Sequence, residues 1–198
     1  MKLFIDMDGV LADFFNAAIR VNINAIINRN VGSMASDERQ QQINHAIQSY
    51  PKGEYQIEKH LGISSAEFWS AIDEHGGAFW SCLDLCEGAI ELWDIAQNHN
   101  PIVLTSPSLQ PHCVSGKLQW LQRMYGSNFR DYIFCPAQHK HLLAGPESIL
   151  IDDRESNCDD WMESGGSAIL WPHLGNRSDL SIDIALNLLK EQIEEFGK

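Results

Sequence analysis

Two aspartates, separated by one residue, follow a short apolar stretch at the start of the sequence. Residues 1–5 have the length of a buried strand, and Asp6 and Asp8 come directly after it, with Gly9 providing a residue that tolerates positive φ. Two carboxylates this close repel each other unless a cation lies between them or one keeps its proton. The pair therefore suits either a hard divalent metal or a division into a nucleophile and an acid. The alternative is an acidic turn that faces solvent, because Asp and Gly are common turn residues.

Two further apolar stretches also end in polar residues, and two lysines lie near them in the sequence. The polar residues are Thr105 with Ser106 and Asp152 with Asp153, and the lysines are Lys117 and Lys140. In an open parallel sheet, ligands bind in the crevice at the carboxyl ends of the strands, so we expect these side chains there. For both lysines the alternative is a solvated position on the surface.

Apolar periodicity predicts the elements that position these residues. Strands are expected at 1–5, 101–105, 132–134, 148–153 and 168–171. Helices are expected at about 13–28, 37–50, 64–77, 89–96, 114–125 and 180–196. Strands that alternate with helices are typical of an α/β fold with a parallel sheet.

The stretch between the first and second predicted strands contains no convincing strand. We interpret residues 15–85 as a helical cap, and residues 1–14 together with 86–198 as a Rossmann-like parallel sheet core flanked by helices. Ser64 and Glu67 have the spacing of a capping box, which marks the start of one cap helix. A cap inserted after the first strand would close over the strand ends that carry the polar residues.

Composition limits the partners of the chain. Its formal net charge of −13 argues against binding to polymeric nucleic acid, because phosphate contacts need clustered Lys and Arg. No stretch reaches the roughly 18 apolar residues of a membrane span, and the apolar start is too short for a signal peptide. We therefore expect a cytoplasmic protein without a membrane partner. The charge does not exclude a small phosphorylated substrate held by a metal.

The order of these motifs carries a family resemblance. The pattern hhhDxDG, then hhhT/S, then Lys, then hhhhDD resembles the haloacid dehalogenase superfamily of phosphotransferases. A closer resemblance is to the 5′(3′)-deoxyribonucleotidases, which remove phosphate from nucleoside monophosphates. It is carried by Asp-Met-Asp-Gly-Val-Leu-Ala-Asp-Phe at 6–14, Leu-Thr-Ser-Pro at 104–107, the Lys117-x-x-Trp120-Leu121 helix and Ile-Asp-Asp-Arg at 151–154.

This resemblance implies roles for the acidic residues. Asp6 would attack phosphorus and become an aspartyl phosphate, while Asp8 would protonate the leaving oxygen and then deprotonate the attacking water. Mg²⁺ is the implied cofactor, with Asp6 and the backbone carbonyl of Asp8 among its ligands. The resemblance favours Asp153 as a further direct ligand and Asp152 as one that acts through water, but the sequence does not decide between them.

The resemblance also implies how a substrate is held. Thr105, Ser106, Lys140 and Lys117 would bind phosphate, and Thr105 and Lys140 would also stabilise charge in the transition state. Phe14 and Trp69 would stack on a base, with Arg154 helping to select it. Core packing is the alternative for both aromatic residues. No histidine is expected to bind metal, and His139, beside Lys140, is the only one expected near the site.

The sequence thus predicts a Mg²⁺-dependent phosphomonoesterase acting on nucleoside monophosphates. One alternative is the same chemistry on another small phosphate ester, such as a sugar phosphate. A second alternative, from a different class, is a catalytically silent binding protein on the same fold. The sequence leaves open the base preference, the choice between 5′ and 3′ phosphate, and whether the chain forms a homodimer.

Overall fold

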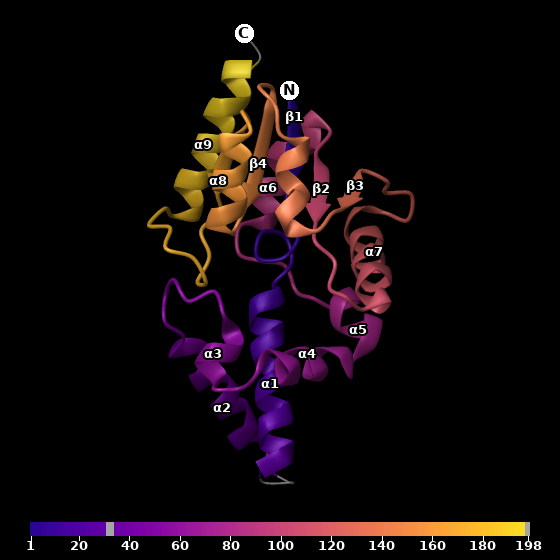
Figure 1. Cartoon of the computed structure of the whole chain (residues 1–198), viewed down its shortest axis with the longest axis vertical. Coiled ribbons are helices and arrows are strands. Elements are labelled where there is room, and N and C mark those ends of the chain that lie inside the picture. Colours follow the sequence, from indigo (N-terminus) through magenta and orange to yellow (C-terminus); the bar gives the residue numbers. More distant parts are fainter. Residues whose placement is uncertain (31–33, 197–198) are drawn as a thin grey trace.

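The computed structural model describes residues 1–30 and 34–196, and within them a five-stranded sheet forms the centre of one half of the molecule (Figure 1). The strands are β1 (Lys2–Ile5), β2 (Ile102–Thr105), β3 (Tyr132–Phe134), β4 (Ser148–Asp152) and β5 (Ser167–Leu170). Their order is β3-β2-β1-β4-β5, and every neighbouring pair is parallel. The predicted α/β class with a Rossmann-like parallel sheet is confirmed.

The register of the central strands places their carboxyl ends at one edge. Ile5 of β1 pairs with Val103 of β2 on one side and with Ile151 of β4 on the other. All five residues of β4 are buried, as expected for a parallel strand covered on both faces. The residues that follow these strands, among them Asp6 and Ser106, therefore emerge side by side at the same edge.

Helices cover both faces of the sheet. They are α6 (Ala89–Ala96), α8 (Glu155–Glu163) and α9 (Ile182–Phe196), whereas α7 (Pro111–Tyr125) extends from the sheet edge toward the helical segment (Figure 1). Two 3₁₀ segments lie at Gln97–His99 and Ala137–Leu143. Side chains alternate between the faces, so Leu3 and Ile5 belong to the large core cluster while Phe4 belongs to a smaller one. In the smaller cluster, Trp161 of α8 packs edge-on against Phe4 with the ring centroids 5.1 Å apart. Helix α8 was not among the predicted elements.

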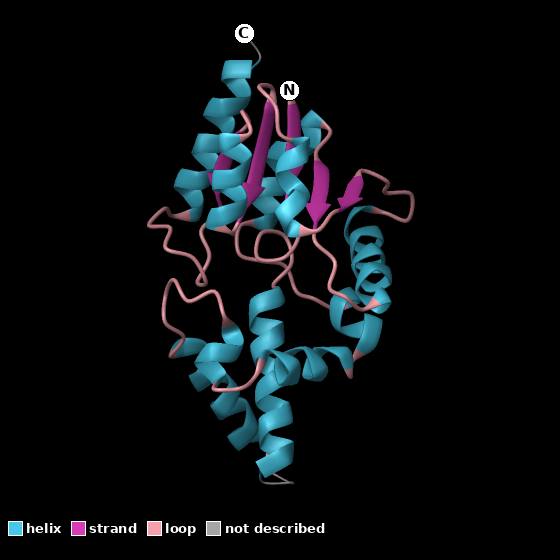
Figure 2. Cartoon of the chain, in the orientation of Figure 1, coloured by secondary structure: helices cyan, strands magenta, loops and turns pink. Residues whose placement is uncertain are grey.

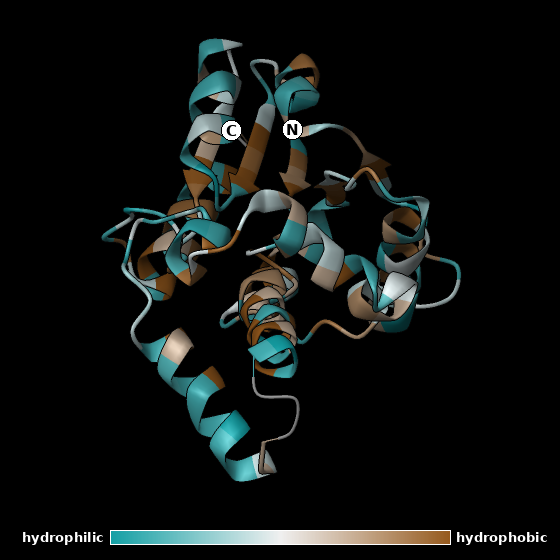
Figure 3. Cartoon of the chain, turned by 60° about the horizontal axis from the view of Figure 1, so that its bottom comes forward, coloured by the Kyte–Doolittle hydropathy of each residue, from teal (hydrophilic) through white to brown (hydrophobic). Residues whose placement is uncertain are grey.

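Between β1 and α6 the described chain contains helices and no strand (Figure 2). These helices are α1 (Phe14–Asn30), α2 (Ser36–Gln48), α3 (Ile57–Leu61), α4 (Ser65–Asp73) and α5 (Gly76–Ser81). Helix α2 is largely polar, in contrast to the apolar strands (Figure 3). The capping box predicted at Ser64 and Glu67 is present at the start of α4. The single helix expected over 64–77 is wrong, because α4 ends at Asp73 and Gly76, with φ of +56°, starts α5 in a new direction. The division into cap and core stays a prediction.

The two ends of this helical insertion lie against each other. Ala12 and Leu85 form an isolated antiparallel bridge, and the Asp13 backbone N–H donates to the carbonyl oxygen of Asp84 at 2.9 Å. The insertion therefore leaves and rejoins the sheet half of the molecule through one short double-stranded stem.

Helix α5 is pressed closely against α7. A Cβ atom at Gly116 would lie 2.4 Å from the carbonyl oxygen of Gly77 and 2.7 Å from the Cβ of Trp80. A side chain larger than hydrogen at Gly116 would force the two helices apart.

Among the described residues, no helix is both long enough and apolar enough to cross a membrane.

Candidate active site

Asp6 lies at the end of β1 and is almost fully buried. Its Oδ1 accepts a hydrogen bond from the Met7 backbone N–H at 2.7 Å, and its Oδ2 lies 2.8 Å from the Nζ of Lys140. The chain then turns at Gly9, where φ is +78° and an added Cβ would lie 2.3 Å from the Oδ2 of Asp153. Only glycine leaves room for this turn to pass so close to a second carboxylate.

Three buried carboxylates converge at this edge of the sheet. One oxygen each of Asp6, Asp152 and Asp153 lies within 4.8 Å of the others. Burial, and then the neighbouring carboxylates, raise the pKa of both Asp152 and Asp153 above the usual range. The structure therefore brings together three acids that the sequence placed at strand ends, while their roles stay predictions.

The two adjacent aspartates differ in how well their oxygens are satisfied. Asp152 accepts from the Arg154 backbone N–H at 2.9 Å, from the Asn157 amide at 2.9 and 3.0 Å, and from Lys140 at 2.7 Å. In contrast, the Oδ1 of Asp153 is buried without a hydrogen-bond partner among the described residues. An unpaired buried carboxylate oxygen is costly, and a cation at this position would remove that cost.

Lys140 bridges two of these acids from the 3₁₀ segment. Only 1% of its side chain is exposed, and its Nζ lies 2.8 Å from Asp6 and 2.7 Å from Asp152. Burial favours the neutral amine, but the charges of the two carboxylates outweigh it and keep the pKa of Lys140 above its ordinary value. The alternative of a solvated lysine at this position is wrong.

Lys117 of α7 is also buried, and it contacts the other predicted catalytic acid. Its Nζ donates to the Oδ2 of Asp8 at 2.5 Å, to the Oγ1 of Thr105 at 2.8 Å and to the carbonyl oxygen of Ser106 at 2.7 Å. The alternative of solvent exposure is therefore wrong for Lys117 as well. Its predicted contact with phosphate would require it to give up one of these three bonds. The Oδ1 of Asp8 and the Oγ of Ser106 are buried without partners among the described residues.

A cavity of about 520 Å³ lies between these groups and the helical insertion. Seven predicted site residues are part of its lining: Asp6, Asp8, Phe14, Trp69, Ser106, Lys140 and Arg154. The lining does not include Thr105, Lys117, Asp152 or Asp153, which lie behind this first layer of side chains. The cavity thus has an acidic floor at the sheet edge and an aromatic wall on the insertion.

The aromatic wall is built around Phe14. Its ring stacks on Trp80 with centroids 5.4 Å apart, and Trp69 lies 6.2 Å away at an angle of 33°. Trp80 is buried, whereas 38% of Trp69 is exposed. Arg154 and Tyr55 also line the cavity, and the guanidinium carbon of Arg154 lies 4.6 Å from the ring centroid of Tyr55, which comes from the segment between α2 and α3.

Several residues of the site were not predicted from the sequence. Tyr55, Asp73, Trp80 and Asn157 line the cavity, and His173 lies 3.5 Å from the Oδ2 of Asp153. Burial lowers the pKa of His173 to about 4, so it is neutral, and its Nδ1 accepts from the Gly175 backbone N–H. His139, which was expected near the site, is exposed and does not line the cavity. Asn157 alone had a signal, since it lies about one helical turn after Asp152 and Asp153.

The donor set fits a divalent cation. Four carboxyl groups, those of Asp6, Asp8, Asp152 and Asp153, face the two ammonium groups of Lys117 and Lys140, so in their ionised forms they would exceed the ammonium charge by two. The ligand atoms would be hard oxygens, including the unpartnered oxygen of Asp153.

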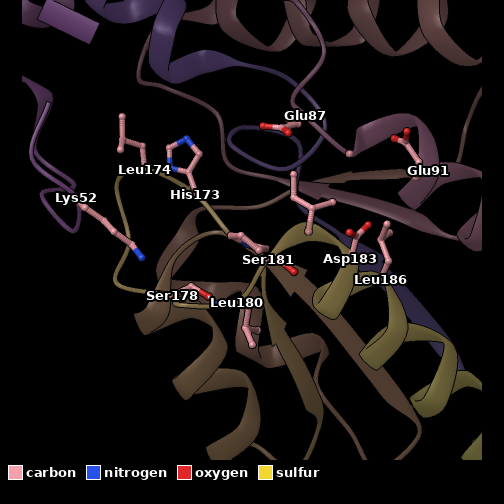
Figure 4. A pocket seen from close by; sticks show the side chains of 13 residues that line it. Lys52, Glu87, Glu91, His173, Leu174, Ser178, Leu180, Ser181, Asp183 and Leu186 are labelled. Carbon is pink, nitrogen blue, oxygen red and sulfur yellow. Dashed lines mark hydrogen bonds between the residues drawn. The ribbon is translucent and has the colours of Figure 1, made fainter. Parts of the chain in front are cut away.

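A second hollow of about 620 Å³ opens elsewhere on the surface (Figure 4). It lies between Lys52, the two acids Glu87 and Glu91 just before and within α6, and the segment from Pro172 to Leu186. Its lining contains His173 but no residue predicted from the sequence to act in catalysis.

Comparison with solved structures supports the fold. A "HAD family hydrolase" from Deinococcus radiodurans with bound phosphate and sodium has a TM-score of 0.56 at 14% identity, covering 99% of this chain and 96% of that one. A "predicted phosphatase" from Clostridium acetobutylicum has a TM-score of 0.55 at 13% identity, with 98% of each chain covered. A HAD-superfamily hydrolase from Geobacter sulfurreducens has a TM-score of 0.52 at 16% identity, covering 97% and 96%. These likenesses show a shared fold.

No curated protein matches the sequence. A family model does: the one described as "5′ nucleotidase, deoxy (Pyrimidine), cytosolic type C protein" matches residues 1–178. With its buried acidic cluster at the carboxyl edge of the sheet, the chain belongs to this nucleotidase family and is a phosphatase of the haloacid dehalogenase superfamily.

Proposed function

We propose that the protein is a Mg²⁺-dependent phosphomonoesterase that dephosphorylates nucleoside monophosphates. The observation that carries this proposal is the single cavity that joins Asp6 and Asp8 to the aromatic wall of Phe14 and Trp69. Its volume of about 520 Å³ lies within the ordinary range for small-molecule sites. The family's description, which names nucleotides as substrates, supports the same reading.

Asp6 and Asp8 would share two chemical steps. In the first, a carboxylate oxygen of Asp6 bonds to phosphorus while the ester bond breaks, and Asp8 gives its proton to the leaving nucleoside oxygen. In the second, water attacks the phosphorus of the aspartyl phosphate and loses a proton to Asp8. The bond to Asp6 then breaks, inorganic phosphate leaves, and both residues return to their starting state.

Mg²⁺ would be held by Asp6, the backbone carbonyl of Asp8 and Asp153. Asp152 has both carboxylate oxygens engaged by hydrogen-bond donors, which favours a contact through water. The Oδ1 of Asp153 has no partner in the described ranges, which favours direct ligation. When bound, the ion would neutralise charge on the phosphoryl oxygens as a Lewis acid.

The word "cytosolic" in the family's description agrees with the expected cytoplasmic location.

The remaining residues would hold the substrate. Ser106 and Lys140 line the cavity and would bind phosphate oxygens, Ser106 through a hydroxyl that has no hydrogen-bond partner among the described residues. Thr105 lies behind the cavity lining and accepts a bond from Lys117, and its contact with phosphate stays a prediction. Phe14, Trp69 and Arg154 would bind the base.

A phosphate-release assay over nucleoside monophosphates and sugar phosphates, with Mg²⁺ and with EDTA, tests the proposal. We expect Mg²⁺-dependent release that is fastest with a nucleotide. Faster release from a sugar phosphate would overturn the substrate class while keeping the chemistry. No release from any ester, p-nitrophenyl phosphate included, would favour a catalytically silent binding protein.

A further inference from the structure

The buried ammonium of Lys117 donates to the Oδ2 of Asp8, the proposed acid, and within the described part of the chain no group bonds to its Oδ1. We infer that Lys117 is a positioning residue that fixes the Asp8 carboxyl group in the orientation from which its proton passes to the leaving group. The inference rests on the proposed function, because it assigns a role within the same two steps. It concerns the geometry of the carboxyl group and gives Lys117 no contact with substrate.

The contacts of Lys117 argue against a direct role in phosphate binding, because its three donors are already engaged. An ammonium group has three N–H donors, and here they reach Asp8, Thr105 and Ser106 at 2.5 to 2.8 Å. The side chain is fully buried and does not line the cavity, whereas Ser106 and Lys140 do. All of its donors therefore serve to tie the end of β2 to the loop after β1.

The position of this ammonium is itself fixed by helix packing. Lys117 follows Gly116, at which α7 meets α5 too closely for any Cβ. The Nζ also lies over the Trp80 ring of α5, 5.0 Å from the ring centroid. Because α7 cannot shift toward α5 and the ammonium is enclosed, Lys117 holds Asp8 against a rigid support. A group that donates a proton to a substrate needs such a fixed position.

The role predicts a dependence on the leaving group. Phenyl phosphate and p-nitrophenyl phosphate have nearly the same shape, but nitrophenolate leaves readily without a proton and phenolate does not. A misplaced Asp8 should therefore slow the first ester much more than the second. The quantity to compare is kcat/KM, since it reports phosphoryl transfer to Asp6 and excludes the later hydrolysis step.

The experiment measures kcat/KM for both esters in wild type, Lys117→Met, Asp8→Asn and the double variant. For Lys117→Met we expect a loss of about 100-fold with phenyl phosphate, the lower end of what general acid catalysis contributes, and less than about 5-fold with p-nitrophenyl phosphate. In the Asp8→Asn background, Lys117→Met should add little further loss, because the two residues act as a unit. The inhibition constant of inorganic phosphate should stay within about twofold of wild type, since Lys117 has no phosphate contact to lose.

Two control variants separate this role from loss of structure. Leu121→Ala removes a fully buried side chain from the same helix, so it reports general weakening of α7 and should depress both esters alike. Lys190→Met removes an exposed lysine of α9 and should leave both unchanged.

Equal losses with both esters in Lys117→Met, with weaker phosphate inhibition, would overturn the inference and assign Lys117 to phosphate binding. Equal losses with unchanged phosphate inhibition and a lowered Tm would also overturn it, as a purely structural role. Failure of the proposed function is a separate result, because wild type would then hydrolyse neither ester or would hydrolyse both and no nucleotide.

Discussion

Truncation of Trp69 to Ala tests whether the aromatic wall binds a base. Trp69 is 38% exposed, and its centroid lies 6.2 Å from that of Phe14. A base inserted between the two rings would need about 3.5 Å to each ring, or about 7 Å between the rings, which is more than the 6.2 Å between their centroids. A base can therefore stack on one face of Trp69 only. Stacking on an aromatic side chain contributes about 1–3 kcal/mol per base, and with a single face available we expect the lower part, about 1–2 kcal/mol. This corresponds to about 5- to 30-fold in kcat/KM.

The assay is the ratio of kcat/KM for a nucleoside monophosphate to that for p-nitrophenyl phosphate. This ratio should fall by about 5- to 30-fold in Trp69→Ala, because only the nucleotide carries a base and Asp6 and Asp8 are untouched. Trp93→Ala provides a matched control. Its ring stacks on Tyr125 with centroids 3.7 Å apart and does not line the cavity, so its loss should lower Tm and leave the ratio unchanged.

An unchanged ratio in Trp69→Ala, together with parallel losses for both substrates, would refute the reasoning. Trp69 would then only pack against Phe68, whose ring centroid lies 5.2 Å away. The sugar-phosphate reading would take first place among the substrate classes.

Asp6→Asn should lower kcat by at least about 1,000-fold while the Tm in the absence of metal does not fall, since the change removes the nucleophile but keeps its shape; turnover within tenfold of wild type would contradict a covalent mechanism. Mg²⁺ at 100 times its Kd should raise the wild-type Tm by about 5–10 °C, and Asp153→Asn should abolish this rise, which calorimetry with EDTA as the control would measure. Ser64→Ala should lower Tm at pH 7 by about 2–4 °C, because it removes the N-cap of α4. Hydrogen bonds from the Ser64 backbone and hydroxyl and from Arg29 lower the pKa of Glu67 to about 2 from an ordinary 4.5. The stabilisation by Glu67 is therefore complete above pH 4.5 and lost as pH falls toward 2, and the difference in Tm between Ser64→Ala and wild type should shrink over that interval.

The order of apolar stretches was sufficient to predict the sheet and most helices. Buried parallel strands such as β4 are short, nearly continuous apolar runs. Few other structural elements need such a run, so it identifies these strands in the sequence. Helix α8 was missed because Glu155–Glu163 is rich in acids and buries only Asn157, Cys158 and Trp161. Its position depends on packing against Phe4, which no local pattern reveals.

The acidic half of the site was predictable for a related reason. Asp6, Thr105 and Asp152 each end a strand, and the topology of a parallel sheet brings such ends together whatever the rest of the chain does. The contacts of Lys117 were not predictable, because they depend on which face of α7 meets the sheet edge. The same holds for Tyr55, which reaches Arg154 from an irregular segment without periodicity.

The stem at Ala12 and Leu85 has a consequence for protein engineering. Because backbone hydrogen bonds already hold the two ends of the helical insertion together, a transplanted segment of another length would add only a loop-closure cost that grows slowly with chain length. The transplanted segment must end before α5, because Gly77 of α5 packs against Gly116 of α7, the helix that carries Lys117. A graft that replaces residues between Asp13 and His75 should therefore redirect the enzyme to new esters while the hydrolytic machinery stays intact, whereas a graft that extends through α5 should disable it.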